Sequence, residues 1–160
     1  MDERSYAHRM TEAPSVRNAR PAERTALEEL QRRASLNNEG DREALLANPD
    51  AIALPPNQIE EGRVFVAERR GSIVGFAAVE PRQDGQTELD GLFVDPGAWR
   101  GGIGRALVDH CCLHARSSGA KILHVIGNPH AADFYRACGF ETVGTQETQF
   151  GVGLLMSKRL

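Results

Sequence analysis

The sequence predicts a mixed α/β domain in which a mostly antiparallel sheet carries helices on both faces. Strand-like apolar runs joined by short turns alternate with segments of helical apolar periodicity, which is typical of layered α/β domains. A strand, a glycine turn, a helix and a second strand follow one another over residues 88–126. Such a crossover forces its two strands to run parallel. The strand pairs before and after it are joined by short turns, so we expect them to be antiparallel.

Size and composition favour one domain and exclude several function classes. The chain has 160 residues, enough to bury a core without metals or disulfides. Its formal net charge of -3 gives none of the basic field that nucleic-acid binding requires. No apolar run approaches the ~20 residues that cross a bilayer. The three cysteines, two of them adjacent, suit a reducing compartment. We expect a cytoplasmic protein, monomer or homodimer, without nucleic-acid or membrane partners.

The first part of the chain predicts a leader, a strand and two helices. Residues 1–14 are polar and unpatterned, so we expect them to be disordered and one domain to span 15–160. A short strand, an amphipathic helix and a second short helix are expected at 15–20, 21–35 and 41–47. The prolines at 49, 55 and 56 predict a long irregular connection.

The second part of the chain predicts six strands of a sheet and two helices that connect some of them. Strands are expected at 64–67, 73–79, 88–94, 121–126, 141–148 and 152–158. One helix is expected from Ile103 to about Ser118, and another from Pro129 to Cys138. Gly139 suits the left-handed position that closes the second helix.

A glycine-rich turn opens the helix that follows strand 88–94. It reads Arg100-Gly101-Gly102-Ile103-Gly104-Arg105. Three glycines in four residues let the backbone approach a ligand, and the first N–H groups of the helix have no internal partners. Because one charge–dipole interaction contributes only ~0.3–1 kcal/mol, several amides and the arginines must act together to bind an anion. The turn alone is also compatible with a tight strand–helix connection, which is the less favoured interpretation.

Two common phosphate motifs fit this turn poorly. The dinucleotide fingerprint needs a third glycine, but Leu107 stands in its place. A P-loop needs Gly-Lys followed by Ser or Thr, and the sequence has none.

Two groups of residues resemble motifs of the GNAT N-acetyltransferase superfamily. Residues 92–96, Leu-Phe-Val-Asp-Pro, with the glycine turn after them resemble motif A. Asn128-Pro129, Ala132, Phe134-Tyr135 and Cys138-Gly139-Phe140 resemble motif B. The resemblance covers roughly residues 15–158 and implies the acyl-CoA N-acyltransferase fold. It also implies an enzyme with acetyl-CoA as acyl donor and no metal.

The same resemblance assigns the cofactor contacts. It implies that the backbone of Leu92, Phe93 and Val94 bonds the pantetheine arm as an added strand would. The pyrophosphate would lie on the turn, Arg100, Gly101, Gly102, Ile103, Gly104 and Arg105. Asn128 would contact the cofactor or order a water. A β-bulge is expected at Asp90-Gly91, and strands 88–94 and 121–126 would splay apart to admit the thioester.

One residue departs from the family pattern. The family has Gln or Arg at the first position of motif A, where this chain has Trp99. Its indole is expected either to pack in the domain, which we favour, or to flank the cofactor.

Two side chains are candidates for acid–base catalysis. The resemblance makes Tyr135 the general acid, and a phenol of pKa ~10 can protonate a leaving thiolate of pKa ~8.5 or above. Glu88 is the preferred base and Asp90 the second choice, since both lie on one face of strand 88–94. A carboxylate is a weak base toward an ammonium, so it would act through water or with a raised pKa.

For most of the remaining histidines, cysteines and arginines that we considered, we expect a structural role. His110 and His114 have metal-ligand spacing but no third ligand, so we expect no metal site. The cysteines at 111, 112 and 138 are expected to pack in the core. Arg69 and Arg70 are expected in a solvated hairpin turn. His130 either caps its helix or faces the acceptor.

Three functions remain open from the sequence. The first is acetyl transfer to a primary amine of a small molecule or peptide, by direct attack in a ternary complex. The second is an acetyl-CoA-binding sensor without turnover, and the third is an unrelated nucleotide-binding protein. Residues 21–62 and 145–153 would shape the acceptor pocket, but they carry no motif that identifies the acceptor.

Overall fold

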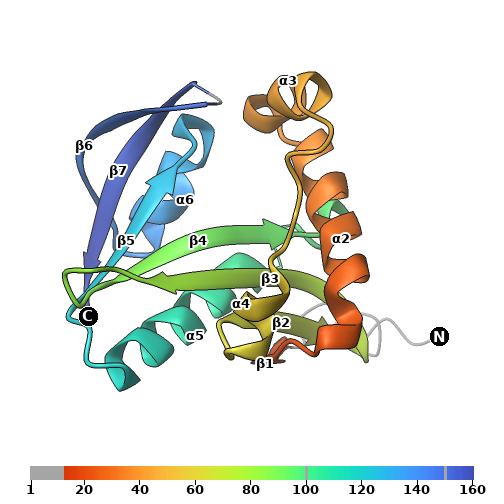
Figure 1. Cartoon of the computed structure of the whole chain (residues 1–160), viewed down its shortest axis with the longest axis horizontal. Coiled ribbons are helices and arrows are strands. Elements are labelled where there is room, and N and C mark those ends of the chain that lie inside the picture. Colours follow the sequence, from red (N-terminus) through yellow and green to blue (C-terminus); the bar gives the residue numbers. More distant parts are fainter. Residues whose placement is uncertain (1–12, 100, 150) are drawn as a thin grey trace, which may run out of the picture.

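The structure, a computed structural model, describes residues 13–99, 101–149 and 151–160. Within these ranges one seven-stranded sheet has the order β1-β2-β3-β4-β5-β7-β6 (Figure 1). Strands β4 and β5 pair in parallel, and the other neighbouring pairs are antiparallel. The predicted fold class, a mixed and mostly antiparallel sheet with helices on both faces, is confirmed. The leader expected at 1–14 lies, but for its last two residues, outside the described ranges.

The strands and helices agree closely with the expected order. The strands are β1 (Ser15–Asn18), β2 (Val64–Arg69), β3 (Ser72–Pro81), β4 (Thr87–Val94), β5 (Ile122–Gly127), β6 (Glu141–Thr148) and β7 (Gly151–Arg159). The α-helices are α2 (Arg24–Leu36), α3 (Glu39–Ala47), α4 (Pro56–Glu60), α5 (Ile103–Ser117) and α6 (Ala132–Ala137). Three short 3₁₀ helices are η1 (Pro21–Glu23), η2 (Pro96–Ala98) and η3 (Pro129–Ala131). None of the described helices has the length and apolar character of a bilayer-spanning segment.

Helix α4 was not expected, because its five residues lie in the connection that the prolines marked as irregular. Pro56 occupies the first helical position, where its fixed φ and missing N–H cost nothing. The helix is too short to show apolar periodicity in the sequence, yet Gln58 and Ile59 are both buried. The helices expected at 21–35 and 129–138 each begin instead with a 3₁₀ turn at their proline.

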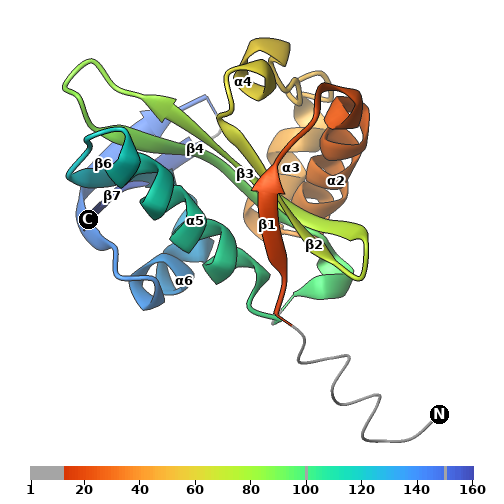
Figure 2. The ribbon, with the colours of Figure 1, turned by 90° about the horizontal axis from the view of Figure 1, so that it is seen from below.

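Two apolar layers hold the domain together, one on each face of the sheet. Helices α5 and α6 cover one face, where Leu107 and Cys111 pack with Leu123 in a single cluster (Figure 2). Helices α2 and α4 cover part of the other face, where Leu27 and Phe76 belong to a second cluster. Burial of this apolar surface is the main driving force for the fold.

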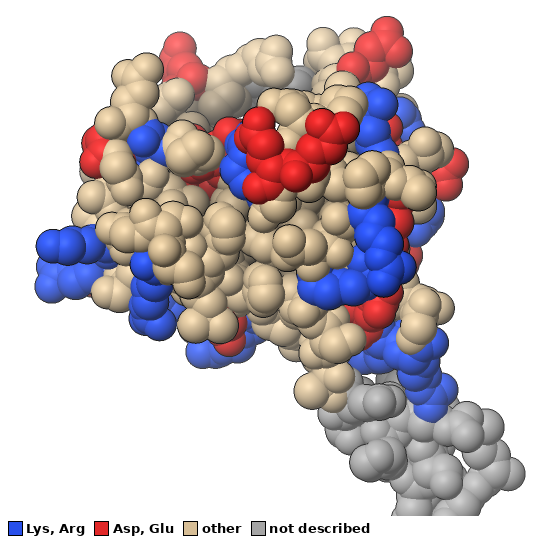
Figure 3. Space-filling model, turned by 60° about the horizontal axis from the view of Figure 1, so that its bottom comes forward, with Lys and Arg blue, Asp and Glu red and all other residues tan. Residues whose placement is uncertain are grey.

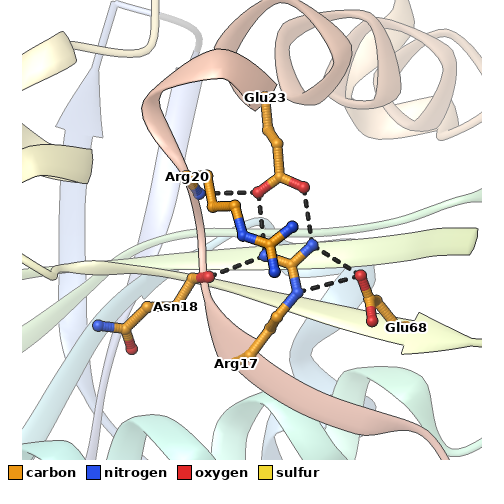
Figure 4. Close-up of polar contacts among 5 residues, drawn as sticks. All are labelled: Arg17, Asn18, Arg20, Glu23 and Glu68. Atoms are coloured by element: carbon orange, nitrogen blue, oxygen red, sulfur yellow. Dashed lines mark hydrogen bonds and ion pairs between the residues drawn. The ribbon is translucent and has the colours of Figure 1, made fainter. Parts of the chain in front are cut away.

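A cluster of ion pairs fastens the first strand to the rest of the domain. The Arg17 guanidinium donates to both carboxylate oxygens of Glu23, at 3.0 and 2.7 Å, and to Glu68 at 3.0 and 2.6 Å (Figure 4). Glu23 also accepts from the backbone N–H of Arg20 at 2.7 Å. The hydrogen bonds from Arg17 lower the pKa of Glu23 below its usual value. These contacts join β1, η1 and β2, so they fix the edge of the sheet.

Replacing Arg17 is expected to weaken the fold in a pH-dependent way. Arg17→Met should lower the free energy of unfolding by about 1–2 kcal/mol at pH 7, because the pairs are half-buried and bidentate. Glu23 has a lowered pKa when folded, so its contribution is present above the unfolded value of ~4.3 and lost as the pH falls through the folded value. Urea unfolding at pH 7 and pH 3 measures the difference.

Arg136→Met is the matched control for this measurement. Arg136 pairs with the fully exposed Asp133 at 3.2 Å, and such a pair contributes about 0–1 kcal/mol. If both variants lose the same stability, or if the Arg17 effect persists undiminished at pH 3, the network does not fasten β1.

Candidate active site

The site begins where β4 separates from β5. The two strands pair only from Thr87 to Leu89, against Leu123 to Val125. Beyond this point β4 continues with β3, but opposite Ala78 and Val79 stand Gly91 and Leu89, so Asp90 is the extra residue of a bulge. The bulge expected at Asp90-Gly91 and the splay between the strands are therefore both present. In the part of the chain that the structure describes, residues 91–94 of β4 pair with no strand on the β5 side.

The glycine turn presents the free end of α5 beside this unpaired edge. Gly102 is the N-cap of α5 with φ of +77°, a left-handed conformation that glycine adopts readily. The first intrahelical bond links Ala106 N–H to the Gly102 carbonyl, and the earlier amides of α5 have no backbone acceptor among the described residues. A Cβ on Gly104 would lie 3.0 Å from the Phe134 ring, so glycine permits this close packing. Arg100, also predicted here, lies outside the described residues.

Arg69 supports the glycine turn through a hydrogen bond, a contact that the sequence did not reveal. Its guanidinium donates to the Gly101 carbonyl at 2.8 Å, and a Cβ on Gly101 would lie 2.7 Å from it. The expectation that Arg69 is merely solvated in a hairpin turn is wrong. Arg69 and Gly101 are 32 positions apart in the sequence, and only the order of the strands in the sheet brings them together.

A cavity of about 890 Å³ joins these elements. Its walls are the end of β4 with Leu92, Phe93 and Val94, the start of α5 with Gly102 to Arg105, and residues of η3 and α6. One side of α2 and α3 closes it, with Ser35 and Asp41. The structure thus brings most predicted cofactor residues to one space. Glycine 101 supports the turn without lining the cavity, and Asn128 does not line it either.

Tyr135 lies in the wall of this cavity, almost fully buried. Its ring packs edge-on against Phe134 and Phe140, with centroid separations of 5.2 and 5.4 Å. A Cβ on Gly127 would lie 3.2 Å from the ring, so β5 also supports it. Burial raises the pKa of the Tyr135 phenol, and the neighbouring Cys138 and Asp41 add to the effect. The phenol is consequently protonated at neutral pH, as a proton donor must be.

Trp99 sits at the rim of the cavity rather than in the core. Its indole N–H donates to the Val94 carbonyl at 2.9 Å, and 47% of the residue is exposed. Trp99 lines the cavity, so this geometry fits the alternative of an indole that flanks the cofactor. The bond also occupies one of the backbone acceptors at the end of β4.

Asn128 connects the two sides of the cavity. Its side-chain oxygen accepts from the His130 N–H at 2.9 Å, and its Nδ2 donates to Asp41 Oδ1 at 2.9 Å. Asn128 therefore caps η3 and holds α3. The sequence offered no signal for this pairing, because 87 residues separate the two side chains.

Glu88 lies outside the cavity that holds Tyr135. It precedes the bulge and lines a separate cavity of about 440 Å³ with His124 and Ile126. Burial raises the pKa of Glu88; nearby Arg82 opposes this, while Asp90 and Glu80 add to it. The carboxylate of Asp90 accepts from Gln58 at 3.2 Å. Glu88 is the middle residue of the part of β4 that pairs with β5, and Asp90 is the first residue beyond that part.

The remaining candidates have structural surroundings. His110 and His114 pack their rings against Phe65, at centroid separations of 4.6 and 5.1 Å, and burial lowers the pKa of both. The three cysteines are buried, as expected. Among the described residues, no group of three His, Cys, Asp or Glu side chains could hold a metal ion. His130 lines the main cavity, in agreement with one of its two predicted roles.

The unpaired strand edge, the N-terminus of α5 and the buried phenol line one cavity, and comparisons with known proteins identify the family. A family model described as an acetyltransferase (GNAT) domain matches residues 60–142. An aminoglycoside N(6′)-acetyltransferase type 1 of Stenotrophomonas maltophilia is 34% identical, over 81% of this chain and 87% of that protein. An uncharacterised N-acetyltransferase of Methanocaldococcus jannaschii is 33% identical over 51% of this chain, and the match spans 40% of that longer protein.

A solved structure shares the whole fold. PaiA N-acetyltransferase from Thermoplasma acidophilum, solved in complex with coenzyme A, has a TM-score of 0.74 at 16% identity. The alignment covers 93% of this chain and 100% of that one. The chain belongs to the GNAT family of acetyltransferases, and it is an enzyme that acts with acetyl-CoA. The family predicted from motifs A and B is confirmed; membership does not specify the acceptor.

The glycine turn can be tested with two glycines of the same conformation. Gly102 and Gly85 have φ of +77° and +83°, and a Cβ on either meets no atom within 4 Å. Alanine at each should cost about 1–2 kcal/mol of stability through left-handed strain. Only Gly102→Ala should weaken the Kd for CoA, by about tenfold, because it displaces the free amides of α5. Isothermal titration calorimetry measures this, and equal Kd values for the two variants would exclude the turn from the CoA site.

Proposed function

We propose that this enzyme transfers the acetyl group of acetyl-CoA to a primary amine of a small molecule or peptide, by direct attack in a ternary complex. The observation that carries the proposal is the single cavity shared by the free end of α5, the unpaired end of β4 and the Tyr135 phenol. The free end of α5 suits the pyrophosphate of the cofactor, the unpaired end of β4 suits the pantetheine amides, and the phenol suits the sulfur of the thioester. We further propose a cytoplasmic protein without nucleic-acid or membrane partners.

The donor would bind through backbone groups. The amides of Ile103, Gly104 and Arg105 would receive the pyrophosphate, with the Arg105 side chain in the same wall. The unpaired edge from Leu92 to Val94 would hydrogen-bond the pantetheine arm, as a strand does when it joins a sheet. Trp99 would lie beside that arm, since its indole already holds the Val94 carbonyl.

The acceptor ammonium first loses one proton to the base through water, and the chemical step that follows consists of one acyl transfer and two proton transfers. The neutral amine attacks the thioester carbonyl, the carbon–sulfur bond breaks, and the electron pair leaves on the CoA sulfur. Tyr135 would donate its proton to this thiolate, which its buried and protonated phenol can do. The amine nitrogen loses its proton to a base, so the products are the amide and CoA thiol.

The base would be Glu88, acting through water, with Asp90 as the second candidate. Glu88 does not line the cavity of Tyr135, so a direct contact with the amine is not proposed. Its raised pKa makes it a better base than an ordinary carboxylate. Asp90 stands at the bulge itself, but its carboxylate already accepts a hydrogen bond from Gln58.

The acceptor is proposed to be cationic before it reacts. The Stenotrophomonas relative is named for acetylation of aminoglycosides, which carry several amines. The face in Figure 3 mixes basic and acidic side chains around a broad area of other residues, so it offers no uniform basic patch for a polyanion.

Removing the Tyr135 hydroxyl tests the acid role. Tyr135→Phe keeps the ring contacts with Phe134 and Phe140, so the fold and the Kd for CoA should be unchanged. The value of kcat should fall about 10²-fold or more, because the thiolate then leaves without a positioned donor. Thiol release from acetyl-CoA, with kanamycin and simple alkylamines as acceptors, measures the rate.

Two results would contradict these assignments. A kcat within about threefold of wild type would show that water supplies the proton instead of Tyr135. Folded, CoA-bound protein that releases no thiol with any amine would favour the sensor hypothesis over catalysis.

Replacing Glu88 should separate activity from stability. Burial raises the pKa of Glu88, so its ionised form is disfavoured in the folded state and any stability it contributes is lost as the pH rises through that pKa. Glu88→Gln should therefore unfold at the wild-type temperature or above it at pH 7. Its kcat should fall about 10–100-fold, and the acid limb of the pH–rate profile should disappear, because that limb reports the ionisation of the base. If Asp90→Asn does this and Glu88→Gln does not, Asp90 is the base.

A further inference from the structure

The first turn of α3 is held tightly against the corner after β5. A Cβ on Gly40 would lie 2.2 Å from Asn128 Nδ2 and 2.7 Å from the His130 ring, so glycine is required for this approach. The adjacent Asp41 accepts from Asn128 Nδ2 through Oδ1 at 2.9 Å. Asn128 is itself fixed by the His130 N–H. The orientation of the Asp41 carboxylate is therefore set by groups that are already in place.

The second oxygen of Asp41 has no partner. Within the part of the chain that the structure describes, Oδ2 makes no hydrogen bond or ion pair. Asp41 is half-buried and lines the main cavity, where its charge acts on the Tyr135 phenol. The carboxylate is thus close to the place where the thioester would lie. A fixed, partly desolvated carboxylate with a free oxygen attracts a cation strongly.

Asp41 also belongs to a second, smaller cavity of about 210 Å³ between α2, α3 and the chain that follows them. Both cavities include Ser35, Asp41 and Phe93, so they adjoin at these residues. The other walls of the smaller cavity are mainly aliphatic, with Ala44, Leu45 and Ile52. Asp41 is the one ionisable group that lines it among the described residues. Among the described residues that line the main cavity, Arg105 is the one arginine or lysine, and it lies at the α5 end.

We propose that Asp41 binds the ammonium group of the acceptor, whose aliphatic part lies in the smaller cavity before the amine meets the thioester beside Tyr135. This assignment rests on the proposed acetyl transfer. It names the acceptor class as a primary alkylammonium, because the walls offer apolar contacts and a single negative charge. Asp41 is then a residue for acceptor binding, and the proton of the reacting amine leaves through the base discussed above.

The test compares a charged and an uncharged ligand of the same shape on CoA-bound protein. Pentylamine should bind wild type more tightly than 1-pentanol, and Asp41→Asn should weaken the Kd of pentylamine by about tenfold or more while leaving pentanol unchanged. The asparagine oxygen can still accept from Asn128, so the local structure is kept. Glu43→Gln removes the same charge from an exposed position of α3 and is the control. An NMR titration measures each Kd.

Kinetics and a second variant complete the test. Asp41→Asn should raise the KM for pentylamine about tenfold with kcat and the KM for acetyl-CoA changed little. If the variant does not fold, Asn128→Ala, which removes the partner that orients Asp41, should raise the same KM. Equal pentylamine Kd values for wild type and Asp41→Asn, or equal losses in the Glu43→Gln control, overturn the proposal. A tenfold loss of binding in protein that releases no thiol supports Asp41 but contradicts the proposed acetyl transfer.

Discussion

The separation of β4 from β5 after three paired residues is the constraint on which the rest of this structure depends. A regular parallel pair would satisfy the backbone of β4 and leave no edge for a ligand. The extra residue at Asp90 bends β4 away, as β-bulges do, and the unpaired backbone of Leu92 to Val94 becomes one wall of a large cavity. The chemistry of the family needs an edge of this kind, because a pantetheine arm carries amides that must be hydrogen-bonded when they leave water.

Around this opening the chain holds two helix ends in fixed positions. Arg69 and the left-handed Gly102 set the N-terminus of α5, where the dipole and the free amides suit a phosphate. Gly40 and Asn128 hold the N-terminus of α3 on the opposite side, and with it the carboxylate of Asp41. The α5 end of the cavity carries Arg105 and the helix amides, α6 adds Asp133, and α3 carries Asp41. A donor that is an anion and an acceptor that is a cation can bind one cavity without competing.

The sequence predicted the parts of this site that depend on local backbone chemistry. The glycine turn, the bulge at Asp90-Gly91 and the position of Tyr135 after motif B follow from short-range patterns, as do nearly all strands and helices. It could not predict contacts between distant segments: Arg69 with Gly101, and Asp41 with Asn128. These pairings arise only when the sheet order brings β2 to the turn and α3 to the corner after β5. Helix α4 was missed for a different reason, since five residues are too few to show a period.

A crystal structure with acetyl-CoA bound tests the central claim most directly. We expect the pyrophosphate on the amides of Ile103 to Arg105, the pantetheine arm along Leu92 to Val94, and the sulfur within hydrogen-bond distance of the Tyr135 hydroxyl. Cofactor bound elsewhere would contradict it. So would a sulfur remote from Tyr135, or a β4 that closes onto β5 along its full length when the cofactor binds.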